Sequence, residues 1–193
     1  MSKVIFDTSM SLDGFMTAAN VRPEEPLGDG GEQLHWWAFG QDEVSRKLME
    51  EESEKLGAVI CGRTTYDHSI QWWGADGPTG PLRRPVFVVT HSAPATSPNN
   101  GVYSFVIGGI AQALEAARKA AGSKNISVMG GADIGQQYIR AGLVDEISIH
   151  LAPVLFGSGT RMFEHLGNEH IQLEAVGAIQ TVTTTHLRFR VVK

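Results

Sequence analysis

The sequence predicts an α/β fold with a mixed, mainly parallel central sheet, helices on both faces and antiparallel C-terminal strands. In the first two thirds of the chain, short apolar strand-like runs alternate with segments whose apolar residues have helical spacing. The last third contains strand patterns without helices, which favours antiparallel pairs. We expect one domain over residues 1–193, because this length suits a single substantial core.

The composition excludes several classes of protein. A content of 42% hydrophobic and 19% charged residues is typical of a globular protein, and a net charge of -5 argues against nucleic-acid binding. The N-terminus has no signal-peptide pattern and no apolar run approaches a membrane span of about 20 residues, so we expect a cytoplasmic protein without membrane contact. The single Cys61 excludes an internal disulfide and a CxxC site.

The N-terminal part combines a strand, a long loop and a helix. Residues 4–10 predict a strand that ends in the turn-like sequence SLDG, and residues 11–40 predict an irregular loop. Asp42 is the expected N-cap of a helix that continues to about Leu56. Its acidic run, residues 50–54, is expected on the solvated face. The residues expected to point inward are Val44, Leu48, Met49 and Leu56.

Two strands in the middle of the chain end in polar residues. Residues 58–61 predict a buried strand that runs into GRTTY at 62–66 and the start of a helix. Residues 85–89 predict a third strand, which ends in Thr-His-Ser at 90–92. A short strand over 103–107 and a helix over 109–121 follow.

The stretch 125–143 has the clearest pattern, because an apolar strand runs directly into Gly130 and Gly131 and then into a helix that ends before Gly142. The free N–H groups at the start of that helix could bind phosphate oxygens with help from the helix dipole. The alternative is a tight turn that binds nothing, and the two glycines alone favour neither interpretation.

The C-terminal third predicts three strands. Residues 144–154 alternate, with Ile147, Ile149 and Leu151 on one face and Glu146, Ser148 and His150 on the other. Residues 171–192 predict two strands around Gly177 and Ala178. Leu187, Phe189 and Val191 are expected on the core face of the last strand.

Three predicted strand ends therefore carry glycine-rich or polar residues, at 62–65, 90–92 and 130–134. Ligands of open α/β sheets bind at the carboxyl ends of strands, so these segments could hold one extended dinucleotide. Arg63, with His91 and Ser92, could bind an additional phosphate, which favours NADP over NAD. A Rossmann fold is the weaker alternative, because GGADIG places its second glycine one position too early.

Five segments together resemble the dihydrofolate reductase-like fold, and more closely the reductase domain of the bacterial riboflavin pathway. They are SLDG at 11–14, GRTTY at 62–66, VVTHS at 88–92, VMGGADI at 128–134 and GLVDEISIHLAPVLFGSG at 142–159. The resemblance covers nearly the whole chain. It implies an NADPH-dependent reductase that acts on a ribosylaminouracil phosphate or a similar compound.

The resemblance also implies roles for particular residues. The cofactor phosphates would contact Gly62, Arg63, Thr64 and Thr65, the adenosine end would contact Thr90, His91 and Ser92, and the pyrophosphate would contact Gly130, Gly131, Ala132, Asp133 and Ile134. Asp13 and Gly14 match the loop that flanks the nicotinamide and the substrate. Asp13 is the candidate for orienting the substrate or relaying a proton, and the alternative is a turn aspartate before a glycine.

Other features concern the substrate side. The exposed aromatic side chains of Trp36 and Trp37 could stack on a flat heterocycle, and plain packing is an equal alternative. The chain lacks the paired cysteines of the zinc deaminase domain found in the bifunctional riboflavin enzyme, and its histidines lack metal-ligand spacing. No carboxylate near Asp42 securely matches the acidic group of folate reductases.

The expected activity is hydride transfer from NADPH to a C=N or comparable carbon of a pterin-like or ribosylaminouracil-like substrate. The alternative is a non-catalytic NADP-binding module with a regulatory role. Apolar residues on the late strands and the habit of the family predict a homodimer.

Overall fold

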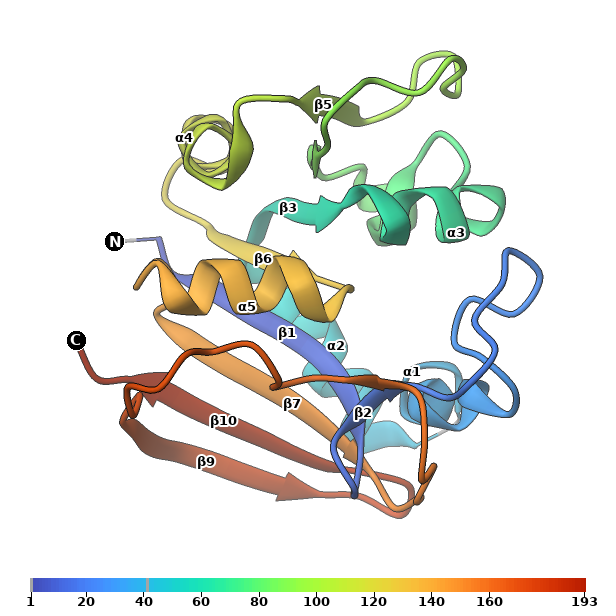
Figure 1. Cartoon of the computed structure of the whole chain (residues 1–193), viewed down its shortest axis with the longest axis vertical. Coiled ribbons are helices and arrows are strands. Elements are labelled where there is room, and N and C mark those ends of the chain that lie inside the picture. The colour runs from blue at the N-terminus through green and yellow to red at the C-terminus, as the bar shows by residue number, and fades with distance from the viewer. Residues whose placement is uncertain (1, 41) are drawn as a thin grey trace.

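The computed structural model describes residues 2–40 and 42–193. The main sheet of the fold has eight strands. In spatial order its strands are β5 (Tyr103–Val106), β4 (Val86–Val89), β3 (Leu56–Gly62), β6 (Asn125–Met129), β1 (Val4–Ser11), β7 (Glu146–Ala152), β10 (Thr185–Val191) and β9 (Leu173–Gln180) (Figure 1). The strands from β5 to β7 are parallel to one another, whereas β10 and β9 are antiparallel. The predicted mainly parallel sheet with antiparallel C-terminal strands is confirmed.

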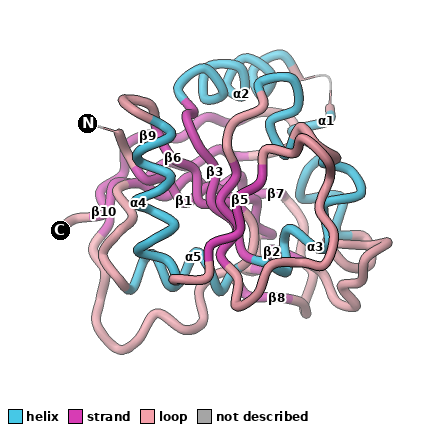
Figure 2. The backbone as a smooth tube through the Cα atoms, turned by 90° about the horizontal axis from the view of Figure 1, so that it is seen from above, coloured by secondary structure: helices cyan, strands magenta, loops and turns pink. Residues whose placement is uncertain are grey.

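Helices cover both faces of the sheet, as predicted (Figure 2). On one face lie α2 (Glu43–Lys55) and α3 (Arg63–Trp73), and on the other lie α4 (Gly109–Ala121) and α5 (Ala132–Arg140). Among the described residues, no helix has the length and apolar character needed to cross a membrane. The loop expected over residues 11–40 contains short elements that the sequence did not indicate. These are β2 (Phe15–Thr17), paired with β8 (Thr160–Arg161), η1 (Gly31–His35) and α1 (Trp36–Phe39).

The main hydrophobic core lies between the sheet and the helices α4 and α5. Val4, Phe6, Ile60 and Tyr138 are fully buried there, because alternate residues of each strand point to the same face. The expected core face of β10 is confirmed, since Val191 is buried and Leu187 and Phe189 pack against this core.

The opposite face of the sheet is polar where α2 covers it, and one prediction for this helix is wrong. Asp42 is the N-cap as expected, because its Oδ2 accepts a 2.7 Å hydrogen bond from the Ser45 N–H. Val44 and Met49, however, are 49% and 38% exposed, and the buried residue of the helix is Ser45. The helix turns its polar residues inward because the sheet presents polar side chains to it.

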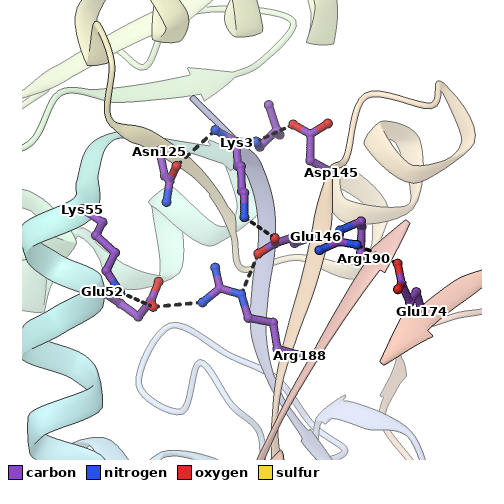
Figure 3. A network of polar contacts seen from close by, with 10 residues as sticks. Lys3, Glu52, Lys55, Asn125, Asp145, Glu146, Glu174, Arg188 and Arg190 are labelled. Atoms are coloured by element: carbon purple, nitrogen blue, oxygen red, sulfur yellow. Dashed lines mark hydrogen bonds and ion pairs between the residues drawn. The ribbon is translucent and has the colours of Figure 1, made fainter. Parts of the chain in front are cut away.

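Four charged side chains join α2 to this face of the sheet (Figure 3). Glu146 is buried and binds Lys3 Nζ at 2.5 Å and Arg188 Nε at 2.6 Å. Arg188 Nη1 also binds Glu52 of α2 at 2.9 Å. Glu52 is therefore half-buried in an ion network, which corrects the prediction that the whole acidic run is solvated.

The C-terminal hairpin turns later in the chain than expected. Gly177 and Ala178 lie inside β9, and the turn is formed by residues 181–184, where the N–H of Thr181 donates to the Thr184 carbonyl. All of β9 is exposed at the edge of the sheet, including Leu173, Val176 and Ile179. These residues are consistent with the homodimer, which stays a prediction.

Candidate functional site

The carboxyl ends of β3, β4 and β6 lie side by side at one edge of the sheet. Gly62 pairs with Val89, and Ile60 pairs with Val128, so the segments that follow these strands begin at nearly the same level. The structure thus brings together the three segments that the sequence singles out, residues 62–65, 90–92 and 130–134. Their side chains differ in burial and in the contacts that they make.

Arg63 joins the first two segments. Its Nε donates to the two carboxylate oxygens of Asp67 at 2.7 and 2.9 Å, and its Nη1 donates to the Ser92 carbonyl at 2.7 Å. Nη1 also lies 3.4 Å from the Thr90 hydroxyl oxygen. The guanidinium is therefore fixed at the start of α3, facing the turn that follows β4.

A cavity of about 600 Å³ lies beside this guanidinium, between α3 and the loop 94–98. Arg63, Tyr66, Asp67 and Gln71 line it from the helix. Its place and its mixed polar and apolar walls suit the adenosine end of a dinucleotide. His91 and Ser92 are exposed next to this loop, and Thr64 is exposed on the first turn of α3.

Gly130 and Gly131 form a tight turn against α3. Both have left-handed φ angles, 62° and 63°, and a Cβ on Gly130 would lie 2.5 Å from Thr65 Cγ2. Only glycine allows this close approach, which links the third segment to the first. Gly131 is the N-cap of α5. The side chains of Ala132 and Ile134 are buried, so a ligand here would meet their backbone, while Asp133 is exposed and accepts a bond from Gln137.

Asp13 lies in a different environment. Its carboxylate accepts hydrogen bonds from the Ser11 hydroxyl at 2.6 Å, the Gly157 N–H at 2.7 Å and the Phe156 N–H at 3.2 Å. The Ser11 bond, followed by these backbone donors, lowers the pKa of Asp13 to about 2 despite some opposing desolvation. Asp13 therefore has no proton to donate at neutral pH. Gly14 adjoins it, and its carbonyl accepts from the Met162 N–H.

The two tryptophans differ in their surroundings. Trp36 is 53% exposed and lines a smaller cavity with Gln33 and residues 152–154 and 182–183. Trp37 is half-buried, its indole stacks on the His150 ring with centroids 3.9 Å apart, and its Nε1 donates to Ser9 Oγ at 3.0 Å. The aromatic surface of Trp37 thus belongs to the polar face of the sheet.

Sequence reasoning missed a chain of hydrogen bonds on this face. His150 Nε2 lies 2.9 Å from Asp7 Oδ1, the Nδ1 atoms of His150 and His186 lie 2.7 Å apart, and His186 Nε2 lies 3.2 Å from Ser45 Oγ. These residues come from β1, β7, β10 and α2. The alternation of residues 144–154 placed His150 on the non-core face, but its partners are far away in the sequence.

The surroundings of this chain control its protonation. Burial, and next the neighbouring His150, lowers the pKa of His186 to about 4, so His186 is neutral at pH 7. Burial opposes ionisation of Asp7, but the positive charge that His150 has when it is protonated, together with its hydrogen bond, outweighs burial and holds the pKa of Asp7 below its usual value. Asp7 is therefore ionised at neutral pH.

Comparison with known proteins places most of the chain in one family. Residues 2–187 match the model of the RibD C-terminal domain family. The uncharacterized protein YwjB of Bacillus subtilis is 30% identical over 116 residues, which are 60% of this chain and 63% of that protein.

Two solved structures share the fold. One is a Thermotoga maritima deaminase and 5-amino-6-(5-phosphoribosylamino)uracil reductase, with a TM-score of 0.66, 11% identity, and coverage of 99% of this chain and 57% of that chain. The other is the Enterococcus faecalis dihydrofolate reductase complexed with NADP(H), with a TM-score of 0.61, 12% identity, and coverage of 99% and 97%. The predicted dihydrofolate reductase-like fold is confirmed.

Proposed function

Because the chain belongs to the RibD C-terminal domain family, we propose that it is an NADPH-dependent reductase of a pterin-like or ribosylaminouracil-like substrate. The observation that carries this proposal is that Arg63, Thr65 and the turn at Gly130–Gly131 lie together at one edge of the sheet, beside a cavity of about 600 Å³. The solved relatives are named as a uracil-derivative reductase and as a reductase complexed with NADP(H), which is consistent with this activity.

The residues at this edge fit the chemistry of a dinucleotide phosphate. In our proposal the N–H groups at the start of α5 bind the pyrophosphate, because the positive end of the helix dipole points there. Arg63, held by Ser92 and Asp67 beside the cavity, binds the 2′-phosphate through charge-assisted hydrogen bonds. NADPH when bound supplies the hydride, so the protein contributes binding, orientation and charge.

The substrate side lies on the polar face of the sheet. Asp7 is in register with Met129, the last residue before Gly130, so it lies one strand away from the proposed pyrophosphate site. Trp37 offers a half-buried aromatic surface next to it. We assign Trp37 to the substrate wall. Asp13 and Gly14 hold the loop at 155–162, and we propose that Asp13 orients the substrate through that loop rather than by proton transfer.

The proposal is tested by titrating the protein with NADPH and then adding the ribosylaminouracil phosphate or dihydrofolate. Binding seen by fluorescence, followed by oxidation of NADPH that depends on one of these compounds, supports a reductase. Binding of NADPH without oxidation in the presence of either compound favours the alternative, a regulatory NADP-binding module.

Arg63 should set the preference for NADPH over NADH. Charge-assisted bonds to the 2′-phosphate contribute roughly 1.5 to 3 kcal/mol, so we expect about a tenfold to hundredfold higher affinity for NADPH in the wild type. Arg63→Ala should remove most of this difference, and isothermal titration with both cofactors measures it. Arg46→Ala, which removes an exposed arginine of α2, is the control and should keep the preference. Equal wild-type affinities for the two cofactors would refute the assignment.

A further inference from the structure

The hydrogen bonds from Ser45 to Asp7 have one consistent direction when both imidazoles are neutral. A neutral imidazole donates from one nitrogen and accepts at the other. His150 Nε2 faces the ionised carboxylate of Asp7, which only accepts, so Nε2 carries the hydrogen and His150 Nδ1 accepts. His186 Nδ1 must then donate to it, which leaves His186 Nε2 to accept from the Ser45 hydroxyl. Every polar atom along this chain is thereby satisfied.

The chain of hydrogen bonds has one open end. Ser45, His186 and His150 are buried, whereas the Asp7 side chain is 35% exposed. At the closed end, the Ser45 N–H is held by the Asp42 carboxylate. A ligand can therefore reach this chain at the Asp7 carboxylate.

Apart from the His150 imidazole, the cations around the chain are already paired with carboxylates. Arg188, the guanidinium on the same face, is already bound by Glu146 and Glu52, and with Lys3 these four charges cancel. In η1, burial lowers the pKa of His35 to about 4, so His35 is neutral at pH 7. When His150 is neutral, the open end thus carries a negative charge that no lysine or arginine among the described residues neutralises.

An aromatic wall stands beside this charge. Ser9, two residues after Asp7 on the same face of β1, accepts the Trp37 indole N–H, and the Trp37 ring stacks on His150. An anion next to a flat aromatic surface suits a planar heterocycle with a protonated nitrogen.

We propose, resting on the reductase function above, that Asp7 binds the protonated nitrogen of the substrate C=N bond and that His150, His186 and Ser45 are positioning residues for its carboxylate. The nitrogen takes its proton from solvent as the substrate binds, and Asp7 stabilises that charge. The neighbouring carbon becomes a better hydride acceptor, and when it is reduced the π electrons of the C=N bond become the nitrogen lone pair.

The first test needs neither cofactor nor substrate. Histidine-labelled protein at pH 7 is measured by long-range ¹⁵N NMR, which distinguishes the two neutral tautomers and the cation. We expect His150 as the Nε2–H tautomer and His186 as the Nδ1–H tautomer. A cationic His150, or the reverse tautomers, would overturn the proposed direction and the free charge on Asp7.

The second test uses the isosteric change Asp7→Asn. With NADPH and the ribosylaminouracil phosphate, we expect kcat to fall about 100-fold or more, because a charge that stabilises the reacting group is lost. The affinity for NADPH should stay as in the wild type. Retention of kcat in Asp7→Asn contradicts the role of Asp7.

The positioning role is tested by the pH profile. In His186→Leu, His150 Nδ1 loses its donor, so the pKa of Asp7 should rise and the acidic limb of kcat/KM should move up by about one pH unit. The exposed His170→Leu is the matched control and should leave the profile unchanged. If His186→Leu lowers Tm but leaves the pH profile of kcat/KM unchanged, the chain of hydrogen bonds stabilises the fold and does not position Asp7.

These measurements distinguish a failure of the proposed reductase function from a failure of the inference about Asp7. If the wild type does not bind NADPH, the reductase function fails. The tautomers of His150 and His186 measured by NMR still test the proposed direction of the hydrogen bonds. If NADPH binds and is oxidised equally well by Asp7→Asn, only the inference about Asp7 fails.

Discussion

Replacing Gly131 by valine should abolish NADPH binding. A side chain at this left-handed position, with φ at 63°, would begin 3.2 Å from Thr65 Oγ1 and stand at the N-terminus of α5, where we place the pyrophosphate. Loss of two charge-assisted bonds of roughly 1.5 to 3 kcal/mol each predicts an affinity at least about 100-fold weaker. Fluorescence titration with NADPH measures it.

The same helix supplies the control. Gly142, just past the C-terminal end of α5, also has a left-handed φ, 66°, but a Cβ there has no atom within 4 Å. Gly142→Val should therefore lower stability through similar backbone strain, of order 1 to 3 kcal/mol, and keep its affinity for NADPH. If both variants lose Tm and both still bind NADPH, the glycine pair is only a tight turn.

The sequence predicted that residues 62–65, 90–92 and 130–134 come together at one edge of the sheet, because its signals there are local. A strand, a glycine or threonine and a helix follow one another within ten residues at 58–66 and at 126–134, and parallel strands must end on the same edge. The contact of Arg63 with Ser92 follows from that rule and from the adjacency of β3 and β4.

The polar face beneath α2 could not be predicted in the same way. Asp7, His150 and His186 lie on three strands that become neighbours only through the order β1-β7-β10, and the sequence does not state that order. The expected burial of Val44 and Met49 on α2 was wrong for a related reason. Apolar spacing predicts the buried face of a helix only where the surface beneath it is apolar, and here that surface carries His186, Arg188 and Glu146.

Glu146 should be the charged residue on which the fold depends most. Its buried carboxylate holds Lys3 and Arg188, so Glu146→Ala leaves the half-buried Arg188 with Glu52 as its remaining carboxylate (Figure 3). Removing one partner of a buried pair costs about 3 to 5 kcal/mol when it leaves an uncompensated charge, and because Arg188 keeps Glu52 we expect a loss near the lower end of that range. Urea unfolding followed by circular dichroism measures the loss. Glu174→Ala, which breaks the exposed pair between Glu174 and Arg190, should cost at most about 1 kcal/mol.

The pH dependence of this effect distinguishes charge from packing. Burial opposes ionisation of Glu146, but its bonds to Lys3 and Arg188 outweigh it, so its pKa in the folded protein lies below the usual 4.5. A carboxylate with a lowered pKa stabilises the fold fully above its unfolded pKa and loses that contribution as the pH falls through the folded pKa. The stability difference between wild type and Glu146→Ala should therefore be constant at neutral pH and shrink below about pH 4.5. A difference that stays constant down to pH 3 would mean that the side chain contributes by filling space, and that the ion network adds little.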